Sequence, residues 1–137
     1  DVCSSDLYYK NKTIGITGTK GKSTTTNLVY FLLKNLNFNK IIIDPGFGFG
    51  KTLTHNLQLL AQLSHFNQLQ CPILVGMSRK SMLGTILGGA PVNQRLFAGL
   101  SAATIAALNG AHIIRTHDVK ATIDSLAVVN AMLSIGK

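Results

Sequence analysis

The sequence predicts an α/β fold in which short parallel strands alternate with helices. Three observations support this. Four short segments are built on Ile, Leu or Val, each is followed by a stretch of helical character, and three of the four end in polar residues. Short, continuously apolar strands between amphipathic helices are typical of a parallel sheet that helices cover.

The predicted strands share this apolar composition: TIGITG (13–18), IIIDPG (41–46), PILVGM (72–77) and AHIIRT (111–116). The predicted helices follow them at STTTNLVYFLLKNL (23–36), HNLQLLAQLSHF (55–66), SMLGTIL (81–87) with NQRLFAGLSAATIAALNG (93–110), and VKATIDSLAVVNAMLS (119–134). Gly110 stands where a helix should stop before the fourth strand.

Length and composition indicate one packed domain. The 137 residues are 46% hydrophobic and 13% charged, which excludes a disordered chain. The net charge is +8 and every acidic residue is Asp, a balance that suits an anionic ligand. Nucleic-acid binding is disfavoured because the Lys and Arg residues are scattered, without interleaved aromatics. No membrane span or export signal is recognisable, so we expect a soluble cytoplasmic protein.

Polar residues gather at the ends of three predicted strands. Asp44 follows the second strand, the run 78–81 follows the third, and the run 115–118 follows the fourth. Ligands of parallel α/β folds bind at the carboxyl ends of strands. We therefore expect these residues to share one site.

The stretch GTKGKST after the first strand has the character of a phosphate-binding loop. Gly18 and Gly21 would let backbone N–H groups hold phosphates, Lys22 would reach the terminal phosphates and Ser23 would bind Mg²⁺. The standard spacing requires glycine where Ile16 stands. This variant resembles the Mur ligase family over about residues 12–36, most closely the UDP-N-acetylmuramoylalanine–D-glutamate ligases.

The rest of an ATP-dependent ligase is missing. Mg²⁺ needs a carboxylate opposite the Ser, that family uses Glu, and the sequence contains none. An ATP-binding fragment is therefore the alternative interpretation of the chain. GFGFGK (46–51) is not a dinucleotide loop, because its third spacing is wrong and no acidic residue stands between Asp44 and Asp118.

IIIDPGFGFGKTLTHN, GMSRKS and RTHD, in this order, resemble the C-terminal part of dihydropteroate synthase over about residues 41–134. The resemblance implies a transferase of folate biosynthesis with a (β/α)8 TIM barrel, homodimeric in the family. That enzyme joins 6-hydroxymethyl-7,8-dihydropterin pyrophosphate to p-aminobenzoate, assisted by Mg²⁺. The fold would then be a partial barrel, its last three βα units, plus one P-loop-type βα unit.

The resemblance assigns catalytic, pterin-binding roles to three residues. Asp44 would bind the pterin and stabilise its developing positive charge, although an Asp before Pro-Gly is also typical of a turn. Lys80 would hydrogen-bond the pterin and border the p-aminobenzoate pocket. Arg115 would lie against the pterin and reach the pyrophosphate.

Other residues would complete the substrate sites. Phe49 would contact the p-aminobenzoate ring or simply pack its loop. Ser81 would receive the p-aminobenzoate carboxylate, cap a helix, or do both. His117 would be a second pyrophosphate donor beside Arg115, since positions i and i+2 of a strand share a face. Asp118 is predicted as a helix N-cap, and Lys51, His55, His65 and His112 as structural or surface residues.

The chain is accordingly predicted to have three parts. DVCSSDL (1–7) resembles the translation of a sequencing-library adapter and is interpreted as a non-native scar. Residues 8–40 form the Mur ligase-like unit, and residues 41–137 the dihydropteroate synthase-like part. The simplest hypothesis is an artificial join near residue 40, the alternative being a natural fusion. Without the family's first five βα units we expect no activity from the chain alone.

Overall fold

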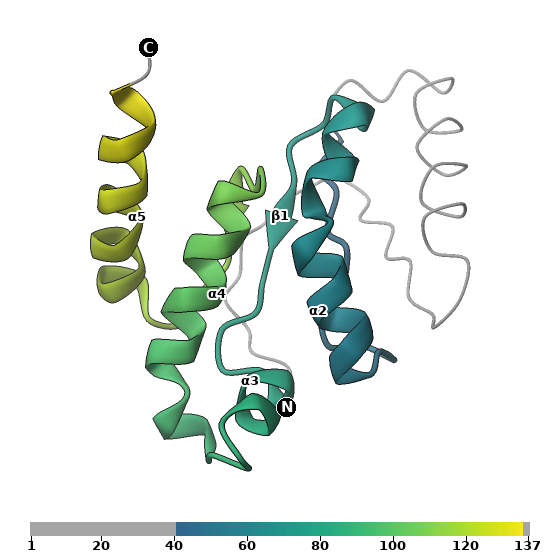
Figure 1. Cartoon of the computed structure of the whole chain (residues 1–137), viewed down its shortest axis with the longest axis vertical. Helices are drawn as coiled ribbons and strands as arrows, with labels where there is room; N and C mark the ends of the chain where they lie inside the picture. Colours follow the sequence, from purple (N-terminus) through teal and green to yellow (C-terminus); the bar gives the residue numbers. More distant parts are fainter. Residues whose placement is uncertain (1–40, 136–137) are drawn as a thin grey trace, which may run out of the picture.

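The computed structural model describes residues 41–135, and Figure 1 shows their arrangement. The predicted scar and the P-loop residues Gly18, Gly21, Lys22 and Ser23 lie outside them. The elements, in chain order, are α2 (Leu53–Ala61), the 3-10 helix η1 (Leu63–Leu69), β1 (Leu74–Val75), α3 (Ser81–Ile86), the 3-10 helix η2 (Val92–Gln94), α4 (Leu96–Leu108), β2 (Ile113–Ile114) and α5 (Val119–Ser134).

Three extended segments lie side by side and run parallel. β1 pairs with β2 in the register Leu74 to Ile113, and Ile43 forms a parallel bridge to Ile73 on the other side. The Ile43 N–H also donates to the Pro72 carbonyl at 2.9 Å. The predicted alternation of parallel strands and helices is thus confirmed for the described residues, although the paired strands are shorter than expected. The assignment to a partial barrel stays a prediction.

The helices agree with the sequence pattern except at two breaks. The helical stretch predicted over 93–110 is the 3-10 helix η2 followed by α4, with Arg95 between them. α5 covers the predicted range 119–134, and Gly110 ends the preceding helix with a φ of +96°. The predicted helix 55–66 is instead α2 followed by η1. The Asn109 amide donates to the Leu60 carbonyl at 2.8 Å, so that carbonyl is already occupied where the α-helix ends.

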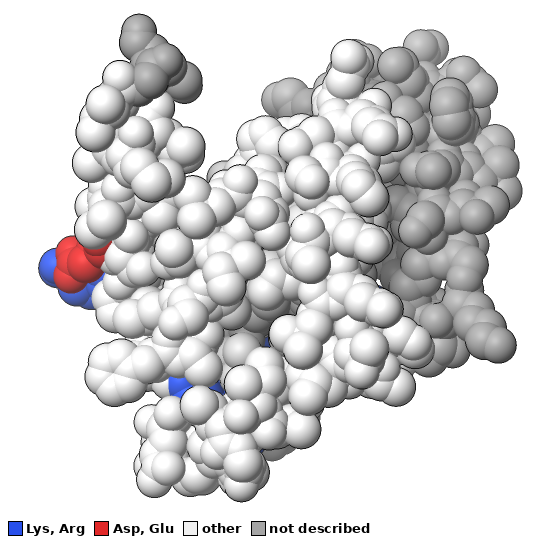
Figure 2. Space-filling model, in the orientation of Figure 1, with Lys and Arg blue, Asp and Glu red and all other residues white. Residues whose placement is uncertain are grey.

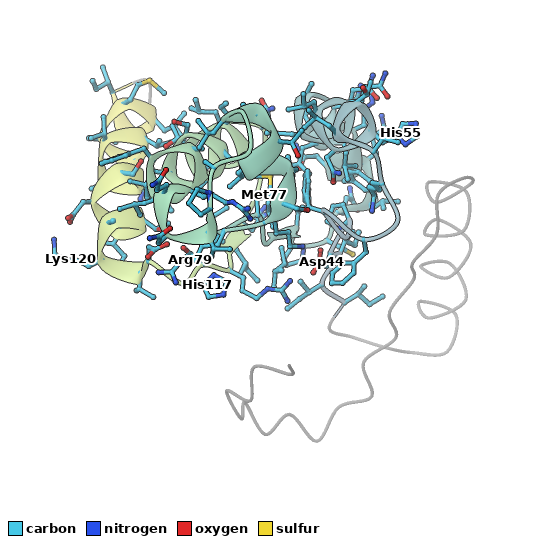
Figure 3. All side chains as sticks on the ribbon, turned by 90° about the horizontal axis from the view of Figure 1, so that it is seen from below. Asp44, His55, Met77, Arg79, His117 and Lys120 are labelled. Atoms are coloured by element: carbon cyan, nitrogen blue, oxygen red, sulfur yellow. The ribbon has the colours of Figure 1, made fainter. Side chains whose placement is uncertain are left out.

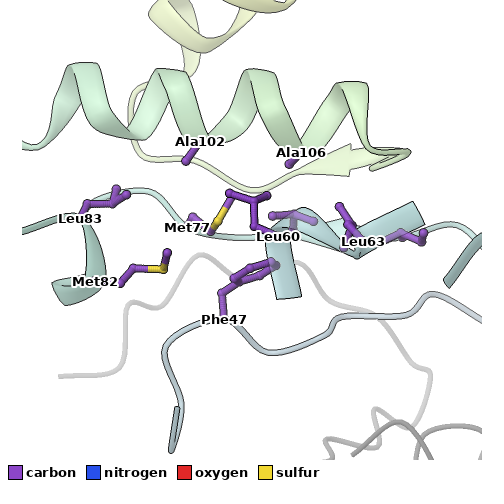
Figure 4. Packing of buried hydrophobic residues seen from close by; sticks show 10 residues of the cluster. Phe47, Leu60, Leu63, Met77, Met82, Leu83, Ala102 and Ala106 are labelled. Atoms are coloured by element: carbon purple, nitrogen blue, oxygen red, sulfur yellow. The ribbon is translucent and has the colours of Figure 1, made fainter. Parts of the chain in front are cut away.

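The core lies between β1 and the helices around it (Figure 4). In Figure 1, α4 and α5 lie on one side of β1 and α2 on the other. The buried residues of the core are Phe47, Leu60, Leu63, Ile73, Val75, Met77, Met82, Leu83, Ala102 and Ala106. Ala102 and Ala106 are one turn apart on α4 and contribute small side chains to this core. None of the helices within residues 41–135 is both long and apolar enough to cross a membrane.

Candidate active site

Asp44, Lys80 and Arg115 come together, each from the carboxyl end of a different extended segment. The Arg115 Nη2 atom lies 3.5 Å from Asp44 Oδ2. Lys80 is close enough for both charges to act on its pKa. The prediction that the strand ends would gather these three residues is confirmed as geometry. Their functional roles remain predictions.

Polar residues that follow the three extended segments lie on the same side of the molecule. In Figure 3, which is seen from below, Asp44, Arg79 and His117 are all labelled along one side. The face seen in Figure 2 carries few charged side chains. The ends of the extended segments therefore present their polar residues on one side, as the sequence pattern indicated.

The Asp44 carboxylate does two things at once. Its Oδ1 accepts the Gly46 N–H at 2.9 Å, which is the turn-forming role expected of an Asp before Pro-Gly. Its Oδ2 faces Arg115. Because the side chain is partly exposed, one carboxylate oxygen holds the loop while the other remains accessible to a ligand.

Asn56 of α2 holds the loop that follows Asp44, a role that was not predicted from the sequence. It is 1% exposed, its Oδ1 accepts the Gly48 N–H at 2.7 Å, and its Nδ2 donates to the Thr52 carbonyl at 2.8 Å. A buried polar group of this kind must have partners, and here both are loop backbone. The spacing of Asn56, Leu60 and Leu63 on one buried face was the signal that could have found it.

Two phenylalanines of the same loop face opposite ways. Phe47 is fully buried in the core, whereas the Phe49 ring is 60% exposed. The Lys80 ammonium lies 4.7 Å from the centroid of the Phe49 ring, a cation–π arrangement. Loop packing is therefore the task of Phe47, and the Phe49 ring is presented outward beside Lys80.

Lys80 bridges two loops. Its Nζ donates to the Phe47 carbonyl, and its methylene chain passes so close to Gly48 that a Cβ there would lie 3.1 Å from Lys80 Cδ. Burial lowers the pKa of the ammonium, with Asp44 acting to raise it and Arg115 to lower it further. A glycine at 48 is thus needed for the path that Lys80 takes.

Arg115 crosses the backbone of the neighbouring segment to reach Asp44. A Cβ at Gly76 would lie 2.9 Å from both Nε and Nη2 of Arg115. The Arg115 side chain is 61% exposed, so its guanidinium face stays open to solvent. Gly76, which was not predicted to have a role, makes room for the Asp44–Arg115 pair.

His117 contacts Ser78 rather than the Asp44–Arg115 pair. Its backbone N–H donates to Ser78 Oγ at 3.2 Å, and its ring nitrogen Nδ1 lies 3.0 Å from the same oxygen. Arg115 and His117 were predicted to share a face, but they have different partners, Asp44 for Arg115 and Ser78 for His117. The two residues do remain at the same strand end.

Of the two predicted helix caps, the one at Ser81 is wrong and the one at Asp118 is right in position only. Lys80, not Ser81, occupies the N-cap of α3, and Ser81 is the exposed first residue of the helix. Asp118 stands at the N-cap of α5, but its side chain makes no capping hydrogen bond. It binds Arg79 instead, because a two-pronged bond to a guanidinium is stronger than one to a neutral backbone N–H.

The remaining histidines have no role in the site. His112 Nδ1 accepts the Ile73 N–H at 3.3 Å, a structural contact, and His55 and His65 are exposed. Across residues 41–135, His, Cys, Asp and Glu nowhere form a group of three or more that could hold a metal ion.

Comparisons with known proteins identify the family to which the chain belongs. The family profile described as "Pterin binding enzyme" matches residues 29–117. The dihydropteroate synthase of Escherichia coli is 56% identical over 95 residues, covering 69% of this chain and 33% of that protein. That of Haemophilus influenzae is 50% identical over 91 residues, covering 66% and 33%. The chain therefore spans about a third of the length of the curated relatives it matches.

Solved structures give the same result. A Yersinia pestis dihydropteroate synthase in complex with a sulfonamide drug superposes with a TM-score of 0.78 at 44% identity, covering 82% of this chain and 42% of that chain. The Xanthomonas albilineans enzyme in complex with 7,8-dihydropteroate gives 0.77 at 38%, covering 80% and 44%. The predicted resemblance to dihydropteroate synthase is confirmed. The family match begins at residue 29, ahead of the boundary predicted near residue 40.

Proposed function

Because the chain belongs to the pterin binding enzyme family, we propose that it is part of a dihydropteroate synthase, a transferase of folate biosynthesis. The reaction would join 6-hydroxymethyl-7,8-dihydropterin pyrophosphate to p-aminobenzoate, giving 7,8-dihydropteroate and pyrophosphate. The observation that carries the proposal is the meeting of Asp44, Lys80 and Arg115 at one edge of the sheet, each from a different extended segment.

Asp44 and Arg115 would act on opposite charges of the same substrate. As the bond between the pterin methylene and the pyrophosphate oxygen breaks, its electron pair leaves with the oxygen and positive charge develops on the pterin. The amine of p-aminobenzoate then attacks the methylene and loses a proton. A fixed carboxylate at Asp44 would stabilise the cation, and the exposed guanidinium of Arg115 would bind the departing pyrophosphate.

Lys80, Phe49 and Ser81 would form the p-aminobenzoate side. An ammonium has three N–H donors, so Lys80 can keep its bond to the Phe47 carbonyl and still donate to the pterin. The exposed Phe49 ring offers a flat surface to the p-aminobenzoate ring. The Ser81 hydroxyl, exposed directly after Lys80, would donate to the p-aminobenzoate carboxylate.

His117 would be the second pyrophosphate donor. Its backbone N–H donates to Ser78 Oγ, and its ring Nδ1 lies 3.0 Å from the same oxygen. Because Ser78 occupies Nδ1, the other ring nitrogen, Nε2, is the one that would face a phosphate oxygen.

Mg²⁺ would be held by the substrate more than by this chain. The described residues offer no cluster of three ligands for a metal. Mg²⁺ is often bound through substrate phosphates with few protein carboxylates. Pyrophosphate oxygens are therefore its expected ligands, and none of the steps above passes through it.

The chain would be inactive alone. The described part has three parallel extended segments, whereas eight strands close a (β/α)8 barrel. We propose that residues 41–137 are the last three βα units of such a barrel. The homodimer that the resemblance implies is likewise a proposal.

Calorimetric titration of the full chain with the pterin pyrophosphate, with and without Mg²⁺, tests this proposal. We expect weak binding that Asp44→Asn weakens further, while the control Asp124→Asn, on the outer surface of α5, leaves it unchanged. Absence of binding in the unmodified chain would overturn the proposal. Sustained turnover on adding p-aminobenzoate would show that the missing units are dispensable.

A second candidate, an ATP-binding Mur ligase-type fragment at residues 8–40, rests on the Gly18–Ser23 motif alone. ATP binding that Lys22→Ala abolishes would support it, and ATP binding unaffected by that change would contradict it. A clean amplification product across the codons of residues 40 and 41 from source DNA would rule out an artificial join.

A further inference from the structure

Arg79 has an unusual backbone conformation directly before Lys80. Its φ is +60°, in the left-handed region that bulky residues seldom occupy. Gln70 is the one other non-glycine residue with a positive φ between residues 41 and 135. Such a conformation persists only where the surroundings hold it.

Two charged residues from other elements hold Arg79. Its Nη2 lies 2.6 Å from Asp118 Oδ1 and its Nε 3.2 Å from Asp118 Oδ2, so the guanidinium and carboxylate meet at two points. The Arg79 carbonyl accepts a hydrogen bond from Arg95 Nη1 at 3.0 Å. Its side chain is therefore fixed from the start of α5, and its backbone from the start of α4.

Arg95 is itself fixed in place. Its Nε donates to the Ala90 carbonyl at 2.9 Å, and its guanidinium lies flat against α3, where a Cβ on Gly84 would be 2.6 Å from it. A hydrogen bond from so constrained a donor gives the Arg79 carbonyl a fixed direction. The direction of that carbonyl determines how the chain enters Lys80.

Lys80 depends on this direction. The backbone of Lys80 itself is extended. Its side chain reaches back to the Phe47 carbonyl and the Phe49 ring, and Asp44 and Arg115 are the charged groups that face it. We propose that Arg79 is a positioning residue, held by Asp118 and Arg95, that aims Lys80 into the candidate site. The importance of Lys80 for substrate rests on the proposed function, but the arrangement itself does not.

Titration of the Lys80 ammonium tests the proposal without substrate. The lysines of the full chain are converted to ¹³C-dimethyl-lysine, and Lys80→Arg identifies the Lys80 signal by its loss. Because burial lowers the Lys80 pKa, we expect this signal to titrate below the ordinary lysine value of about 10.4. In Asp118→Asn we expect the midpoint to rise toward that value as Lys80 becomes more exposed to solvent, and Asp118→Glu to reverse most of the rise.

The direction of the shift separates positioning from a direct charge effect. Loss of a nearby carboxylate, by itself, would lower a lysine pKa. Asp124→Asn, which removes the surface pair with Lys120, is the matched control and should leave the Lys80 signal unmoved. If Asp118→Asn fails to fold, Arg95→Gln decides by the same criterion.

A Lys80 signal that is unchanged or lowered in Asp118→Asn, or moved equally by Asp124→Asn, would overturn the proposal. So would a native Lys80 signal that titrates like the other lysines. Failure of the pterin pyrophosphate to bind would overturn the proposed function alone, because the lysine titration uses no substrate.

Discussion

Two loops bring residues to the candidate site, and they are stabilised in different ways. The Asp44 loop (residues 44–52) contains three glycines with positive φ and is tied to α2 by the buried amide of Asn56. The Lys80 loop (residues 76–81) places an arginine at positive φ and is held by charges at the surface. The first loop thus relies on backbone freedom and burial, and the second on electrostatics.

This difference implies different sensitivities. Hydrogen bonds to a buried amide are shielded from salt and contain no titrating group, so the contribution of Asn56 to the Asp44 loop should be insensitive to both pH and ionic strength. An exposed ion pair is weakened by salt and by protonation of its carboxylate. The Lys80 loop should therefore loosen under conditions that leave the Asn56 hydrogen bonds intact.

The largest expected effect comes from Asn56→Leu. The change keeps the branched shape of the side chain but leaves the Gly48 N–H without its partner, whereas the Thr52 carbonyl keeps the backbone N–H of residue 56. An unsatisfied group of this kind costs about 1–3 kcal/mol, so we expect the free energy of unfolding to fall by about 1–3 kcal/mol in urea titrations. Asn93→Leu, at an exposed position of η2, is the control. An equal loss in both variants would show that the amide does not hold the loop.

Gly76→Ala should have a smaller effect on stability and a specific one on the site. The new Cβ would collide with the Arg115 guanidinium, which is exposed and can move aside, so we expect a loss of about 1 kcal/mol or less. Arg115 would no longer reach Asp44, and binding of the pterin pyrophosphate should weaken about tenfold, or about 1.4 kcal/mol.

Gly99→Ala is the matched control for Gly76→Ala. A Cβ at Gly99 of α4 would make ordinary contact with Leu83 Cδ1 at 3.9 Å, and alanine favours a helix interior by about 0.5–1 kcal/mol. We therefore expect a small gain in stability and unchanged binding. If Gly76→Ala binds the pterin pyrophosphate as tightly as Gly99→Ala does, the space at Gly76 is not needed for the site.

The sequence predicted those features that depend on local pattern. The range of α5 follows from its amphipathic period, and the meeting of Asp44, Lys80 and Arg115 follows from the rule that parallel strands end at one edge. The end of α2 at Ala61 could not be predicted, because the Asn109 amide that takes the Leu60 carbonyl is distant in sequence. Asp118 pairs with Arg79 instead of making a capping hydrogen bond, and this too could not be predicted, because Arg79 is distant in sequence.

Lowering the pH should affect the Lys80 loop through Asp118. The Arg79 guanidinium lowers the Asp118 pKa in the folded chain. A carboxylate whose pKa is lower in the folded chain than in the unfolded chain stabilises the fold fully at a pH above its unfolded pKa of about 3.9. That stabilisation is lost as the pH falls through the lower pKa of the folded chain. Because the pair is exposed, the effect should be the smallest of these and should shrink in high salt. Unfolding titrations from neutral pH downward, at low and high salt, measure this effect.

Asp118→Asn should remove this part of the acid dependence while the salt-independent contribution of Asn56 persists. An acid dependence that is identical in Asp118→Asn would mean that the carboxylate gives the Lys80 loop no stability, and the contrast between the two loops would then be lost.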